Sequence, residues 1–247
     1  MPPDPNELMT PARRAFVQEY ERLRKFYALI NDAPVIAEQY ATGKLPGGIG
    51  RNPVGSPAPA FDRHIRPGMG AFDELRSHAP LIFQFFLSRA ADNYAVYISN
   101  LLAEIFTHRP EVLRTSERVS LDDVLVHKSM QSFIATLAER RVNNLMNDGT
   151  RKLAEYVTAH MGFPLFDTPE GLDKMVEIGA VRNVIAHNRG VVDKRLAERL
   201  PKRNWPIGEP VPLTDGYLWD AMTNLNASVA DIDRRAIQKF GLTATFE

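Results

Sequence analysis

The sequence contains no cysteine. This absence excludes disulfide bonds, thiolate metal ligands and cysteine nucleophiles. Long apolar runs are also missing, because the most apolar stretch, residues 79–88, meets Arg89 before it reaches the roughly 20 residues that span a bilayer. The first residues carry no apolar segment behind a basic end, so we expect no secretory signal. We therefore expect a protein that does not associate with a membrane and resides in the cytoplasm.

An excess of charge of one sign is missing too, since 30 basic residues balance 30 acidic ones. A nucleic-acid-binding protein with this balance needs a local basic patch rather than a global field. Such a patch occurs between residues 182 and 203, where seven Lys and Arg residues and two acids give a local charge of +5. A charged run is usually a solvated face, so the patch alone does not establish RNA binding.

Helical periodicity dominates what is present. Apolar residues recur at spacings of three and four, and no region alternates with the period of two that is typical of strands. We expect an all-α fold, an antiparallel helical bundle. The expected helices cover residues 11–41, 72–107, 150–160 and 217–240, with one more that is capped by Ser120 and carries Met130, and another that begins at Pro169 and carries residues 181–190.

The pattern divides the chain into three segments. Residues 1–41 form an N-terminal tail and an extra helix, residues 42–70 form a loop or linker rich in glycine and proline, and residues 71–247 form the helical bundle, which ends in a C-terminal helix. A loop as long as 42–70 is either functional or mobile. It is the expected hinge between the first helix and the rest.

One arginine lies where an apolar side chain is expected. On the helix that begins at Pro169, Arg182 falls in the same arc as Met175 and Ile178. A guanidinium among aliphatic side chains is costly unless it is paired, so Arg182 should meet an acid, a carbonyl, an interface or a ligand anion. Asn183 and His187 lie four residues apart on a neighbouring face, where Asn183 is placed to orient the imidazole. The plainer alternatives are a helix-dipole role for the arginine and a structural histidine.

These residues resemble a known motif. The stretch RNVIAH, residues 182–187, resembles the R-N-x-x-x-H form of the R-x-x-x-x-H motif of HEPN domains. Residues 188–193 resemble the tail that often accompanies it, and residues 89–102 resemble the first core helix of such domains. The similarity spans residues 72–200 and leaves out the N-terminal helix and the loop.

The resemblance implies a HEPN-like bundle that dimerises around the motif and works as a metal-independent endoribonuclease, with no cofactor. The implied catalytic residues are Arg182, Asn183 and His187, and the implied RNA-binding residues are Arg189, Lys194 and Arg195. The implied partners are single-stranded or structured RNA such as transfer RNA, a second copy of the chain, and an antitoxin or regulatory protein if the enzyme is a toxin or defence effector. The remaining five histidines show no metal-binding spacing, so we expect no metal site.

The chemistry agrees with these residue types. Histidine titrates near neutral pH and acts as general base or acid on the 2′-hydroxyl and the leaving 5′-oxygen, and arginine stabilises the charge that builds on phosphate. Because each chain offers one His187, a twofold dimer would supply two, with Ile178 and Ile185 on the dimer face. A catalytically silent RNA-binding or protein-assembly module and a purely structural dimer remain as alternatives.

Overall fold

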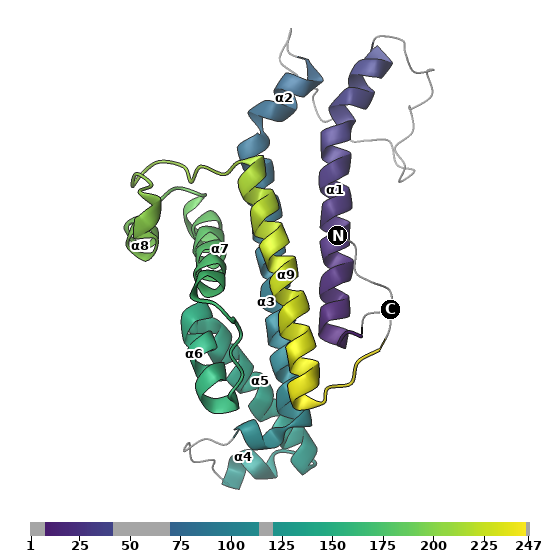
Figure 1. Cartoon of the computed structure of the whole chain (residues 1–247), viewed down its shortest axis with the longest axis vertical. Coiled ribbons are helices and arrows are strands. Elements are labelled where there is room, and N and C mark those ends of the chain that lie inside the picture. The colour runs from purple at the N-terminus through teal and green to yellow at the C-terminus, as the bar shows by residue number, and fades with distance from the viewer. Residues whose placement is uncertain (1–7, 42–69, 114–120, 246–247) are drawn as a thin grey trace.

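The computed structural model of the chain describes residues 8–41, 70–113 and 121–245. Within these ranges every regular element is a helix, with two isolated bridges and no strand, which confirms the all-α fold (Figure 1). The α-helices are α1 (Pro11–Ala41), α2 (Ala71–Ser77), α3 (Ala79–His108), α4 (Leu121–Leu125), α5 (Met130–Asp148), α6 (Thr150–Met161), α7 (Pro169–Asn188), α8 (Lys194–Arg199) and α9 (Asp215–Phe240). Short 3₁₀ turns lie at Pro110–Leu113 and Pro201–Arg203.

Helix α3 is the centre of the bundle, since it packs against α1, α5, α7 and α9. Its buried face is the wide apolar stripe visible in the sequence, and it includes Phe86, Leu101 and Ile105. In Figure 1, α1 lies on one side of the α3–α9 pair and α6 and α7 lie on the other. The continuous hydrophobic core therefore runs along α3 from end to end.

The helix directions follow from the side-chain contacts. Phe16 of α1 packs on Tyr97 of α3, whereas Phe26 packs on Phe86, so α1 and α3 are antiparallel. The Tyr94 hydroxyl lies 3.2 Å from Ser228 Oγ and Arg109 bonds the carbonyl of Phe240, so α3 and α9 run in the same direction. The expected all-α bundle is confirmed, but it is not antiparallel throughout, because the chain returns through α7 before α9 begins.

Two of the expected helices are each divided in two. The predicted helix over residues 72–107 is split at His78 into α2 and α3, because Pro80 lacks an N–H and occupies the first turn of a new helix. Ser120, the expected cap, lies outside the described residues, and α4 ends at Leu125 before α5 begins. Ser129 caps α5, since its Oγ accepts a hydrogen bond from the Ser132 N–H at 3.1 Å.

Helix α1 shares the core of the bundle, although it lies outside the HEPN resemblance. Thr10 precedes α1, and its N–H donates to Oδ2 of the fully buried Asp233 at 3.1 Å. The Ala12 N–H donates to Glu104 of α3, also at 3.1 Å. Burial raises the pKa of both carboxyl groups, and the hydrogen bonds from Thr10 partly offset this for Asp233. The expected hinge loop, residues 42–70, lies outside the described residues apart from Gly70.

Candidate functional site

The site is built on the last turns of α7. Thr168 caps this helix by accepting the Gly171 N–H at 3.1 Å, and Pro169 occupies its first position, as the sequence predicts. The helix ends at Asn188, where Arg189 and Gly190 both adopt positive φ, 55° and 74°. The Gly190 N–H returns to the carbonyl of Val184 at 3.1 Å and closes the helix end.

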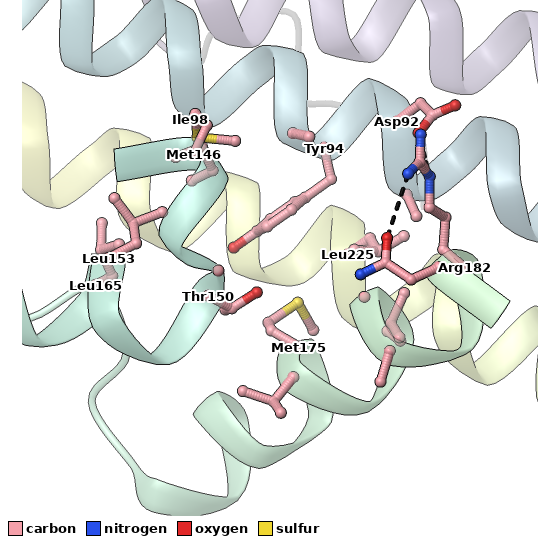
Figure 2. A pocket seen from close by; sticks show the side chains of 18 of the residues that line it. Asp92, Tyr94, Ile98, Met146, Thr150, Leu153, Leu165, Met175, Arg182 and Leu225 are labelled. Atoms are coloured by element: carbon pink, nitrogen blue, oxygen red, sulfur yellow. Dashed lines mark hydrogen bonds and ion pairs between the residues drawn. The ribbon is translucent and has the colours of Figure 1, made fainter. Parts of the chain in front are cut away.

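Arg182 has the acidic partner that its position demands. Its Nε and Nη2 each lie 2.7 Å from Oδ1 of Asp92 on α3 (Figure 2). Its Nη1 donates to Oδ1 of Asn183 at 3.3 Å. The Arg182 side chain is 34% exposed and that of Asp92 is 40% exposed, so solvent screens the pair and it contributes about 0.5–1 kcal/mol. Arg182 therefore ties α7 to α3 at the edge of the core.

Asn183 and His187 are exposed and line a groove of about 300 Å³ between α7 and α8. Arg195 and Arg199 line the same groove from α8. No hydrogen bond joins the Asn183 amide to the imidazole of His187 among the described residues, and the Asn183 oxygen accepts from Arg182. The structure thus brings Asn183, His187 and Arg195 together, with Arg182 next to them.

The charges in this groove are mostly positive. Asp193, its one acid, caps α8 by accepting the Leu196 N–H at 2.7 Å. Arg195 and Arg199 form no ion pair with any residue of the described ranges. Arg189 and Lys194, the other expected RNA-binding residues, are exposed but do not line the groove, and Lys194 lies 3.8 Å from Glu198.

Two residues of the site were missed as functional candidates in the sequence. Arg199 lines the groove, a neighbouring cavity under Arg182, and a third depression beside Lys202 and Arg203. The signal for it was its spacing of four residues from Arg195 on a basic helix. Asp92 is the second, and it lies in the stretch that resembles the first core helix of HEPN domains.

The expected dimer face is wrong as assigned. Ile178 is 1% exposed and belongs to the core of its own chain, and Ile185 is partly buried against that core. The apolar stripe of α7 is therefore already covered, and a change at Ile178 would destabilise the fold rather than separate two chains. Any second copy at this site has to approach the exposed side of α7 that carries Asn183 and His187.

Across the described ranges, no three His, Asp or Glu side chains come close enough together to hold a metal ion. None of the described helices combines the length and the hydropathy needed to cross a membrane. The α7–α8 groove is the candidate site because it brings His187, Asn183 and two arginines that are unpaired within the described residues together.

Comparisons with known proteins add no family to these observations. No family model matches the chain, and the searches of curated proteins and of solved structures return no match either. The HEPN resemblance therefore depends on the motif residues themselves and on the groove in which they lie.

Proposed function

We propose that the protein is a HEPN-type, metal-independent endoribonuclease. The observation that carries the proposal is the α7–α8 groove, where His187 lies beside Asn183, Arg195 and Arg199 and next to Arg182. Imidazole is the side chain whose ordinary pKa suits proton transfer near neutral pH. The guanidinium groups of Arg195 and Arg199, which form no ion pair in the described ranges, are suited to bind phosphate oxygens.

The reaction needs one base, one acid and charge stabilisation. The 2′-oxygen attacks the adjacent phosphorus, its proton passes to a base, the bond from phosphorus to the 5′-oxygen breaks, and an acid protonates the leaving oxygen. The products are a 2′,3′-cyclic phosphate and a 5′-hydroxyl. In this proposal His187 transfers a proton, while Arg182 and Arg199 stabilise the pentacovalent phosphorus.

Each groove holds one histidine. Because the reaction uses both a base and an acid, a second copy of the chain would supply the other imidazole in a composite site. The exposed side of α7 is the surface available for this contact. The role as a toxin or defence effector and the antitoxin partner rest on the resemblance alone, and the cytoplasmic location rests on the composition of the sequence.

Cleavage assays with matched variants test the proposal. End-labelled single-stranded RNA and transfer RNA are incubated in EDTA with wild-type protein, His187→Ala and His108→Ala. His108 is an exposed histidine at the end of α3 that lines none of the grooves around α7. We expect His187→Ala to lose at least about a hundredfold in rate and His108→Ala to match the wild type. Equal cleavage by all three would refute the role of His187.

A second function is favoured by one observation. Two nitrogens of Arg182 are already committed to Asp92, as in a residue whose role is to join helices. In that case the protein would be a silent RNA-binding or assembly module. RNA binding by wild type and His187→Ala, with no cleavage by either, would favour the silent module over the nuclease.

A further inference from the structure

A cavity of about 310 Å³ lies next to Arg182 and adjoins the α7–α8 groove, with which it shares Asn183 and Arg199. It is enclosed by α3, the junction of α5 and α6, α7 and α9. Its buried floor is formed by Ile98, Leu153, Leu165, Met175, Ile178 and Leu225. Figure 2 shows Tyr94 and Met175 pointing into this space. Its volume is at the lower end of the range of small-molecule sites, roughly 300–1,000 Å³.

The rim of the cavity is polar and cationic. Asp92, Arg182 and Asn183 lie along one side, as Figure 2 shows for Asp92 and Arg182. Arg199 lies on the rim near Gly149, with its Nη2 3.4 Å from the position of a Cβ added to that glycine. Unlike Arg182, Arg199 has no carboxylate partner in the described part of the chain. One guanidinium at the rim is therefore free to meet an anion.

The interior determines what kind of molecule fits. The Tyr94 hydroxyl is engaged with Ser228, and no side chain lining the cavity leaves a buried polar atom without a partner. A nucleobase would carry several polar edge atoms into this space and lose their hydrogen bonds to water. An alkyl chain has no hydrogen bonds to water to lose, and its transfer from water into an apolar cavity is favourable.

We propose that this cavity binds an amphipathic anion, with a short alkyl chain among the aliphatic side chains and a carboxylate head at Arg199. The assignment does not depend on ribonuclease activity. Because Arg182, Asn183 and Arg199 also border or line the α7–α8 groove, the bound head group would lie at the edge of that groove.

Calorimetric titration of the full chain with octanoate tests the proposal. Hexanoate and heptanoate measure the dependence on chain length, and octanamide removes the charge while keeping the chain. We expect the dissociation constant to improve about fourfold for each methylene, and octanamide to bind at least about tenfold more weakly than octanoate. No heat of binding, or equal binding of octanamide, would overturn the assignment.

Four variants locate the ligand. Ala95 lines the cavity, so Ala95→Leu should fill it and abolish binding, whereas Val96→Leu, at an exposed neighbour that does not line it, should bind normally. Arg199→Gln should bind about tenfold more weakly, whereas Arg195→Gln, which changes a groove residue outside the cavity, should not. Circular dichroism checks that each variant is folded. Octanoate binding unaffected by folded Ala95→Leu and Arg199→Gln would refute the proposal, as would tighter binding of adenosine monophosphate than of octanoate.

Discussion

Removing the hydroxyl of Thr10 should destabilise the whole bundle, because that one group serves both α1 and α9. Thr10 is fully buried. Its Oγ1 donates to Oδ1 of Asp233 at 2.5 Å and accepts the Arg13 N–H at 3.1 Å. In Thr10→Ala, the lost helix cap costs about 1 kcal/mol, and the lost hydrogen bond to a buried carboxylate costs about 1.5–3 kcal/mol. We expect the free energy of unfolding to fall by about 3 kcal/mol.

Urea unfolding, followed by far-UV circular dichroism, measures this change. Thr10→Ser is the matched control, since it keeps the hydroxyl and removes only a methyl group, which costs about 1 kcal/mol. If Thr10→Ala unfolds like the wild type, the hydroxyl does not join the two helices. If Thr10→Ser is as unstable as Thr10→Ala, packing of the methyl group rather than hydrogen bonding holds this end of the bundle.

Three further predictions concern other contacts. Burial raises the pKa of Asp233 in the folded state, so the unfolded chain releases this proton first as pH rises. The free energy of unfolding, relative to that of Asp233→Asn, should therefore be greatest at low pH and should fall until the pH reaches the raised pKa. Urea unfolding at several pH values measures this dependence. Gly190→Ala should lower stability by about 1–2 kcal/mol, because φ is 74° and the new Cβ would lie 2.5 Å from Gln84; Gln84→Ala should restore part of the loss in thermal melts. Asp92→Asn should cost about 0.5–1 kcal/mol, and a double-mutant cycle with Arg182→Gln that shows no coupling would contradict the ion pair.

Helix boundaries with strong local chemistry were predictable. The break at Gly149, the start at Pro169 and the long first helix all follow from glycine, capping residues and apolar spacing. The break at His78 was not predictable, because a proline such as Pro80 can indicate either the start of a new helix or a kink within a continuous one. The parallel course of α3 and α9 depends on contacts more than 130 residues apart, and periodicity contains no information about them.

The site divides in the same way. The position of Arg182 on the helical wheel predicts that it needs a partner. That partner, Asp92, is 90 residues away in the sequence, so only the fold identifies it. The stripe that includes Ile178 fits a dimer face and an internal core equally well in sequence, and the fold assigns it to the core. The spacing of four residues places Arg199 on the same face as Arg195, but the groove that both line exists only because α8 packs against α7.

The central claim is that the 2′-hydroxyl of RNA is the nucleophile and that His187 moves its proton. The most direct test compares an RNA with its fully 2′-O-methylated copy, in EDTA, with wild-type protein and His187→Ala. We predict that only the unmodified RNA is cut, only by the wild type, and that the new ends are a 2′,3′-cyclic phosphate and a 5′-hydroxyl. Cleavage of the methylated copy, or cleavage by His187→Ala at the wild-type rate, would contradict the account.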